Sequence, residues 1–337
     1  MAAIFILKPS TNPTRFHDPQ EILKRADAKI PPLILPEPRT VFAERALRLR
    51  QLAAGHAMHD FLLMLAVVCD AQHERLQHYP DVPLPTDEQI DLARLSGYPL
   101  LNTANWQRDP VWRSELRALL GQALDKLPAD SPARSGVQAV IDLPDDALEQ
   151  QADRLLAGIT LSLDIAAAPL IAAGLQLYWT HLVTATQAAH KHPFDMPFEP
   201  NHCPCCGSLP TASITKVRGQ LEGQRYLHCA LCSAQWHYMR VKCANCGSIE
   251  GIHYQALQHV SQDEPSEERA AVEAETCDQC HHYLKIMHMV SDTNVDPIAD
   301  DLATLTLDLL VSDAEYRRYG TNLLLLFGDD ESAAKLP

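Results

Sequence analysis

The stretch "HCPCCGSLP" at residues 202–210 decides how the C-terminal half of this chain folds. It contains two cysteines three positions apart, Cys203 and Cys206, and this spacing recurs three more times within 78 residues. Two thiols in this arrangement supply half of a tetrahedral thiolate metal site, so four such pairs predict two four-sulfur sites. The predicted metal ligands are Cys203, Cys206, Cys229, Cys232, Cys243, Cys246, Cys277 and Cys280.

The sequence between the pairs indicates which pairs share a metal. "SLPTASITKV" and "QRYLHC" read as two strands around a turn, and "GIHYQALQHV" and "AVEAETC" repeat this layout further along the chain. A hairpin brings its two ends together, so we expect the first pair to meet the second and the third to meet the fourth. A crossed arrangement, in which the first pair shares a metal with the third, remains possible but requires the chain to travel further between the pairs. Third strands in "AQWHYMRV" and "HYLKIMHMV" complete two ribbon modules, at about residues 201–242 and 243–290.

Residues beside the cysteines refine this prediction. Gly207 and Gly247 follow two of the pairs and permit the tight turn of a metal-binding knuckle, whereas Ser233 and His281 stand there in the other two, which we expect to be less typical. Cys205 falls between two ligands; a tolerated small residue is favoured over an extra redox thiol or an alternative ligand. Four histidines abut the pairs and are expected to face solvent rather than replace a thiolate: His202, His228, His281 and His282.

The remainder of the chain reads as helical. Residues 1–192 read as mostly helical after an extended, proline-rich segment "KIPPLILPEPRT", with a helix cap expected at Thr40 and a capping box at Thr86 and Gln89. A proline-rich segment at 193–204 marks a boundary. Helical patterns return in residues 291–337, in "DPIADDLATLTLDLLV", where Asp296 is the expected cap, and in "SDAEYRRYG". The apolar end "TNLLLLFG" is expected to dock back. The predicted fold is therefore α+β: an N-terminal helical bundle (1–192), two tandem four-cysteine modules of the zinc-ribbon type (193–290) and C-terminal helices (291–337).

Composition excludes several functions. The 337 residues carry a formal net charge of −15, which disfavours binding to nucleic acid or to anionic membranes. The most apolar run, at residues 165–179, is shorter than the roughly 20 residues that a membrane span needs. No signal peptide is apparent, so we expect a cytoplasmic protein whose cysteines are not disulfides. Cys69, outside the cysteine-rich region, is expected to be a small buried residue.

The cysteine pairs and their surroundings resemble the formate dehydrogenase accessory protein FdhE family. The resemblance is carried by "CPCCGSLP", "RYLHCALCSAQWHYMRVKCANCGS", "ETCDQCHHYLK" and "DPIADDLATLTLDLL", which cover about residues 201–311. It implies a cytoplasmic bacterial protein that contacts the catalytic subunit of respiratory formate dehydrogenases, which contains molybdenum and selenium, during assembly and before export by the twin-arginine route. It also implies rubredoxin-like sites associated with iron, with the ligand role falling on the eight paired cysteines.

Chemistry alone leaves the metal open, because four thiolates suit zinc and iron equally. The expected function is a non-enzymatic assembly factor, or chaperone, since we find no nucleophile–base pattern, phosphate loop or metal site with an open position. Two alternatives stay in view: a redox or sulfur-handling metalloprotein, and a zinc-ribbon nucleic-acid binder. The sequence says nothing of oligomeric state.

Overall fold

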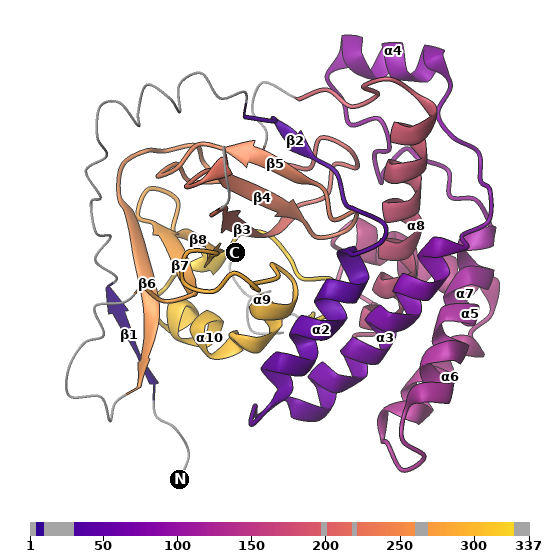
Figure 1. Ribbon diagram of the computed structural model, residues 1–337, viewed down its shortest axis with the longest axis horizontal. Helices are drawn as coiled ribbons and strands as arrows, with labels where there is room; N and C mark the ends of the chain where they lie inside the picture. Colours follow the sequence, from indigo (N-terminus) through magenta and orange to yellow (C-terminus); the bar gives the residue numbers. More distant parts are fainter. Residues whose placement is uncertain (1–4, 10–29, 197–200, 218–220, 260–268, 327–337) are drawn as a thin grey trace. The chain divides into compact units, whose positions relative to one another are not determined.

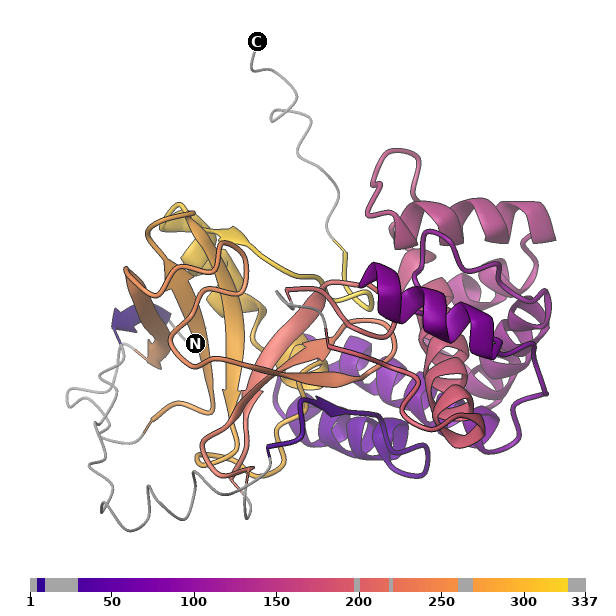
Figure 2. The same cartoon turned by 90° about the horizontal axis from the view of Figure 1, so that it is seen from above.

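The computed structural model describes residues 5–9, 30–196, 201–217, 221–259 and 269–326, which Figures 1 and 2 show from two directions. The chain divides into two compact units. We call them the helical unit (Leu35–Leu209, Cys229–Ala234 and the chain from Asn322 on) and the sheet unit (the chain up to Ile34, with Pro210–His228 and Gln235–Thr321). Parts of the expected proline-rich boundary and of the loops within both hairpins lie outside the described residues.

The helical unit is built from amphipathic helices that bury their apolar stripes against one another. The helices described in it are α2 (Val41–Ala53), α3 (His59–Gln77), α4 (Asp87–Ser96), α5 (Val111–Lys126), α6 (Ala133–Ile141), α7 (Asp145–Leu156) and α8 (Ala168–Ala189). The capping box predicted at the start of α4 is confirmed, because Thr86 and Gln89 exchange side chain-to-backbone hydrogen bonds. The Thr40 side chain, by contrast, makes no capping hydrogen bond to α2 among the described residues.

Helix α8 is the central helix of its unit. Its residues from Ala168 to Tyr178 are all buried, which explains the apolar run in the sequence. Two tryptophans are buried in this core: Trp179 of α8 itself donates to the carbonyl of Leu101 at 3.0 Å, and Trp112 on α5 donates to Glu149 at 2.8 Å. Among the described residues, no helix has both the length and the apolar character needed to cross a membrane.

The sheet unit contains one mixed sheet, to which nine strands of the described chain contribute. The strands are β1 (Phe5–Pro9), β2 (Leu33–Ile34), β3 (Pro210–Thr215), β4 (Arg225–Cys229), β5 (Gln235–Tyr238), β6 (Ile252–His259), β7 (Val272–Cys277), β8 (His282–His288) and β9 (Arg317–Arg318). Their order is β1-β6-β7-β8-β3-β4-β5-β2, and β9 pairs with the start of β8.

The six strands expected between the cysteine pairs are all present, but they do not form separate modules. β3 runs parallel to β8, with Ser213 opposite Ile286, and this pairing joins both three-stranded sets into one sheet. Sequence patterns identify strands and hairpins because these are local. They carry no signal for a pairing between residues more than 70 positions apart, so the joined sheet could not be predicted.

In the C-terminal part of the sheet unit, two helices contact β8 through their side chains. α9 (Ala299–Ala303) begins after Asp296, whose carboxylate accepts hydrogen bonds from the N–H groups of Ile298 and Ala299, as its predicted capping role requires. α10 (Leu305–Asp313) contributes Leu307 and Val311 to a core cluster with Ala274 and Tyr283.

The helix expected over residues 312–320 is wrong. Glu315 adopts a left-handed φ of 65°, and the chain then forms β9 along β8. The N–H groups of Arg317 and Tyr319 donate to the carbonyls of His281 and Tyr283, so strand pairing satisfies backbone groups that a helix would have used. The short apolar end predicted after it contributes the buried residues Leu323 and Leu324.

Candidate metal centres

The two glycine-containing cysteine pairs form knuckles of the same shape. In the first, the N–H of Cys203 donates to the carbonyl of Ser208 and the N–H of Gly207 donates back to Cys203. Cys243 makes the equivalent two bonds with Ser248 and Gly247. The closed turn requires a positive φ at the glycine, which is 77° at Gly207 and 73° at Gly247. The local sequence is therefore sufficient to account for the turn in these two knuckles.

The other two knuckles adopt the same turn without glycine. Ser233 has a φ of 59° and His281 a φ of 53°, both in the left-handed region. The expectation that these knuckles are less typical is wrong for the backbone, which repeats at all four pairs. The expectation holds only for the type of residue, because serine and histidine adopt this left-handed backbone conformation at an energetic cost that glycine does not have.

The structure brings the eight paired cysteines together in two groups of four. Within each group, the four Sγ atoms all lie within 4.8 Å of one another. The groups follow chain order, which confirms the expected sequential grouping and excludes the crossed one. The first group is Cys203, Cys206, Cys229 and Cys232, and the second is Cys243, Cys246, Cys277 and Cys280. We call them the first and the second cluster.

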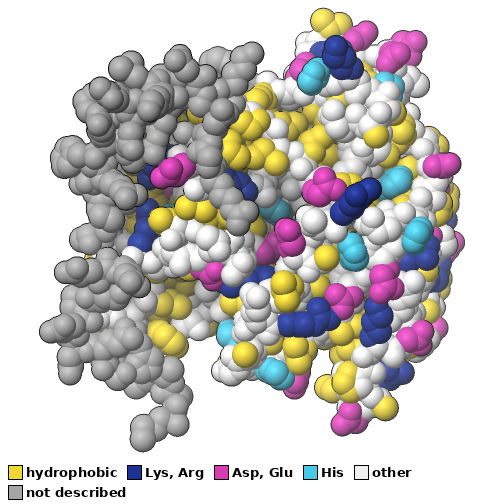
Figure 3. All heavy atoms as spheres, in the orientation of Figure 1, with side chains coloured by type: hydrophobic (Ala, Val, Ile, Leu, Met, Phe, Trp, Pro, Cys, Tyr) yellow, Lys and Arg dark blue, Asp and Glu magenta, His cyan; other side chains and the backbone are white. Residues whose placement is uncertain are grey.

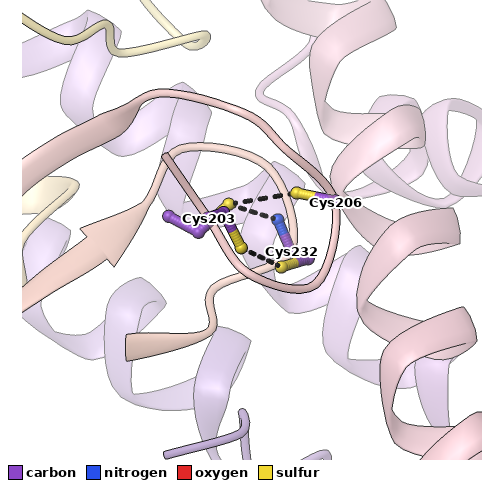
Figure 4. Close-up of side chains that lie close together, drawn as sticks. Cys203, Cys206 and Cys232 are labelled. Atoms are coloured by element: carbon purple, nitrogen blue, oxygen red, sulfur yellow. Dashed lines mark hydrogen bonds between the residues drawn. The ribbon is translucent and has the colours of Figure 1, made fainter. Parts of the chain in front are cut away.

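Both clusters use the same internal arrangement. In the first, the Sγ atoms of Cys203 and Cys232 are 3.5 Å apart, and those of Cys206 and Cys229 are 3.4 Å apart. Figure 4 shows Cys203, Cys206 and Cys232 converging on one point.

In the second cluster, the Sγ atoms of Cys243 and Cys280, and those of Cys246 and Cys277, are each 3.7 Å apart. In both clusters, the first cysteine of the first pair therefore faces the last cysteine of the second pair.

These separations fit a four-coordinate metal ion. Sulfur ligands at about 2.3 Å from a tetrahedral metal lie about 3.8 Å from one another. The measured distances of 3.4–3.7 Å are close to this value, so each cage needs little expansion to hold an ion. Four thiolates with no further donor describe a closed site suited to zinc or to a single iron.

The pKa values of the clustered thiols shift in opposite directions: hydrogen bonds from the neighbouring cysteines outweigh burial at Cys203 and lower the pKa of its thiol. Burial raises the pKa of the Cys229 and Cys232 thiols well above its ordinary value, because an isolated thiolate is poorly solvated there. The N–H groups of Leu231 and Cys232 both point at the Cys229 Sγ at 3.3 Å, which is an arrangement that stabilises a thiolate. Burial likewise raises the pKa of Cys243 in the second cluster. A bound dication offsets the charge that burial disfavours.

The helical unit holds the knuckles of the first cluster from several directions. The N–H groups of Leu101 and Thr103 donate to the carbonyls of Cys205 and Cys206 at 2.9 and 3.1 Å. The Gln176 side chain on α8 donates to the carbonyl of Ala230 at 2.8 Å. The loop before α5 and the middle of α8 therefore position the two knuckles.

Two buried arginines near the clusters were missed by the sequence analysis. Arg45 on α2 is fully buried and donates to the Oγ of Ser233 at 3.2 Å, directly after Cys232, the last cysteine of the first cluster. In the sheet unit, Arg225 pairs with Glu275 at 2.7 Å and donates to the carbonyl of Lys242, directly before Cys243. No local pattern marks such residues, because their partners are distant in sequence.

Cys205 and the flanking histidines stay outside both groups of four. Cys205 is fully buried, and burial raises the pKa of its thiol. Cys69 is buried as expected. His202 is exposed and the His282 ring contacts the carbonyl of Cys280, whereas His228 is buried, so the expectation of a solvent-facing side chain is wrong for that residue.

Together, the fold and the clusters define a class: a mixed helix-and-sheet protein with two four-cysteine sites of metal-binding geometry. Comparison with known families assigns the chain more closely. Residues 30–194 match the family model "FdhE, N-terminal", residues 202–240 match "FdhE, central domain" and residues 241–325 match "FdhE, C-terminal domain". The chain belongs to the FdhE family.

Individual relatives agree with this assignment. A "Protein FdhE homolog" of Klebsiella pneumoniae and a "Protein FdhE" of Salmonella paratyphi B are each 33% identical over 308 residues, which cover 91% of this chain and 95% of the relative. The crystal structure of the FdhE protein from Pseudomonas aeruginosa superposes with a TM-score of 0.75 at 32% identity. It covers 89% of this chain and 100% of that chain.

Proposed function

We propose that this protein is a cytoplasmic accessory factor that formate dehydrogenase requires to become active, and that it binds the catalytic subunit of that enzyme. The observation that carries the proposal is the presence of both four-cysteine clusters in a chain that matches the FdhE family in all three of its domains. The family resemblance identifies formate dehydrogenase as the enzyme that the factor serves. The clusters provide metal sites that either stabilise the factor or take part in its action.

We assign the metal-ligand role to the eight clustered cysteines, with iron as the favoured metal and zinc as the other candidate. Sulfur-only donors and separations near those of a tetrahedral site support this assignment. A four-thiolate site has no open position at which a substrate displaces water, which supports a role that is not enzymatic.

We keep the domain boundaries as part of the proposal: a helical domain to residue 192, a rubredoxin-like four-cysteine region to residue 290, whose two sets of strands share one sheet, and C-terminal helices beyond. The ends of the matched families at residues 194 and 240 support the first boundary and the division between modules.

Charge supports a protein partner rather than a nucleic acid. Residues 201–290, which contain all eight ligands, hold seven Lys or Arg and nine Asp or Glu. On the face drawn in Figure 3, blue and magenta side chains alternate on the described surface. Sequence-independent binding to nucleic acid depends on a concentrated positive surface.

The test is complementation in a bacterium that lacks its own family member. We expect the wild-type chain and the control variant Cys69→Ser to restore formate dehydrogenase activity and to co-purify with the catalytic subunit. The double variant Cys203→Ser with Cys206→Ser is expected to lose one metal per chain and to fail in complementation. Full metal content in that variant contradicts the ligand assignment, and activity without any accessory chain contradicts the function.

The identity of the metal is decided by purification with and without air. About two irons per chain, with thiolate-to-iron absorption that bleaches on reduction, support the iron assignment and give the sites a redox role in assembly. About two zincs and no colour make both cages structural and place the function on the protein-binding surfaces.

A further inference from the structure

The two clusters differ in their access to solvent, although their sulfur arrangements are alike. In the first cluster, all four ligands and Cys205 are 0% exposed. In the second cluster, Cys246 is exposed and Cys280 is half-buried, while Cys243 and Cys277 are buried. One edge of the second cage, formed by Cys246 and Cys280, therefore faces solvent.

The residues between the ligands account for this difference. In the first cluster they are Pro204 and Cys205 in one knuckle and Ala230 and Leu231 in the other, all of them buried. In the second cluster, the corresponding sites in "CANC" and "CDQC" hold Asn245, Asp278 and Gln279 beside a single alanine. Asp278 and Gln279 are exposed and Asn245 is half-buried.

The surroundings of the second cluster leave this edge uncovered by the part of the chain that the structure describes. Next to the knuckle of Cys243 and Cys246, Met239 is 60% exposed, Val241 45% and Ile249 65%, which is unusual for large apolar side chains. Within the described chain, the Asp278 side chain makes hydrogen bonds to the exposed His253 and the half-buried Tyr316. The first cluster is instead enclosed by the loop before α5 and by α8.

Access decides how fast a four-coordinate metal exchanges its ligands. With an ion bound, an incoming donor atom would displace one of the thiolates that hold it, and the displaced thiolate would take up a proton. A hydrophobic, close-packed shell blocks this approach, whereas an exposed edge permits it. The ion keeps its oxidation state throughout, so no oxidant or reductant is needed.

We propose that the second cluster is a metal-exchange site, entered at the Cys246–Cys280 edge by an outside thiolate or nitrogen donor, and that the first cluster is a permanent structural site. This inference rests on the metal-binding role proposed above. The two cages have the same kind of ligands but different functions under this inference. The first stabilises the helical unit, and the second can release its ion to another molecule.

The test uses the full-length chain loaded with zinc and the chelator 4-(2-pyridylazo)resorcinol in excess. Two zincs per chain before chelation establish the sites themselves. We then expect one equivalent to leave faster than the other by about tenfold or more, because solvent access differs. Cys246→Ser is expected to abolish only the fast equivalent, and Cys206→Ser only the slow one. Two bound zincs that leave at one rate overturn the inference alone; fewer than two overturn the ligand assignment.

A second measurement does not remove any ligand. Gln279→Leu introduces the residue that the first cluster has at the same site, Leu231, and is expected to slow the fast phase and leave the slow one unchanged. Alkylation by N-ethylmaleimide, mapped by mass spectrometry, is expected to label Cys246 and Cys280 before any cysteine of the first cluster. Equal labelling of both clusters, or an unchanged fast phase in Gln279→Leu, contradicts the proposed entry edge.

Discussion

At the scale of single residues, the knuckles show that a four-cysteine cluster constrains the backbone more strictly than the sequence reveals. Glycine after the second cysteine marks two knuckles, and their turns can be predicted from it. Ser233 and His281 give no such signal, yet their backbone is the same. The common geometry comes from closing four thiols around one point, and the side chain at these positions must accept a left-handed φ.

The first prediction concerns His281. Replacing it with glycine removes the left-handed strain of an ordinary residue, so His281→Gly is expected to raise the free energy of unfolding by about 1 kcal/mol. Gly247→Ala, at the equivalent position, is expected to lower it by a similar amount. Chemical denaturation of the zinc-loaded chain measures both. A loss of stability in His281→Gly contradicts the strain argument and assigns more weight to the ring contact with Tyr316.

At the scale of elements, the sequence predicts what is periodic or capped and misses what depends on a distant partner. The Thr86 capping box and the Asp296 cap are encoded within four residues of their helices, and both are present. Strand β1 was not predicted, because its identity depends on pairing with β6 about 250 residues away. The same limit explains why residues 317–318 pair with β8 as the short strand β9 where a helix was expected.

Helix α8 supplies a second prediction, because its glycine lies where α5 comes close. A Cβ added at Gly174 meets Leu116 Cδ1 at 2.7 Å and Leu116 Cβ at 3.0 Å. Gly174→Ala is therefore expected to lower the free energy of unfolding by about 1–3 kcal/mol, although alanine favours helices. Gly136→Ala in α6 meets nothing within 4 Å and is expected to gain up to about 1 kcal/mol. Thermal or urea unfolding distinguishes the two; equal gains exclude the close approach.

A third prediction concerns the charges that join β8 to α9 and α10. Lys285 is fully buried, lies 3.2 Å from an Asp301 carboxylate oxygen and also pairs with Asp308. Lys285→Met keeps the side-chain volume but removes the positive charge between two buried carboxylates. In the described structure, Arg318 is then the base that remains beside both Asp301 and Asp308. We expect a loss of about 3–5 kcal/mol in the free energy of unfolding.

The control for this change is an exposed lysine. Lys126 pairs with Glu74 at the surface, so Lys126→Met is expected to cost at most about 1 kcal/mol. Adding Asp308→Asn to Lys285→Met is expected to recover part of the loss, because one unpaired buried charge is removed. Equal costs for the two lysine variants contradict the buried-pair interpretation.

At the scale of the whole molecule, each cluster belongs to one unit. The four cysteines of the first cluster lie within the helical unit, although β4 up to His228 and all of β5 belong to the sheet unit. The four ligands of the second cluster lie within the sheet unit. The sequence analysis assigned each site to its own ribbon module and missed this division, because the contacts of Leu101 and Gln176 with the first cluster are not local in sequence.

The last prediction follows from this division. Metal binding contributes to the folding of the part of the chain that holds the site, so removing one cluster is expected to destabilise mainly one unit. In Cys203→Ser with Cys206→Ser, amide hydrogen exchange is expected to speed up at the knuckles of the first cluster and in α8, while β6, β7 and β8 keep their wild-type rates. Cys243→Ser with Cys246→Ser is expected to give the opposite pattern. Mass spectrometry of peptides from the two variants reads both units at once. Faster exchange throughout the chain in either variant means that the two units unfold as one, and that each cluster stabilises the whole protein.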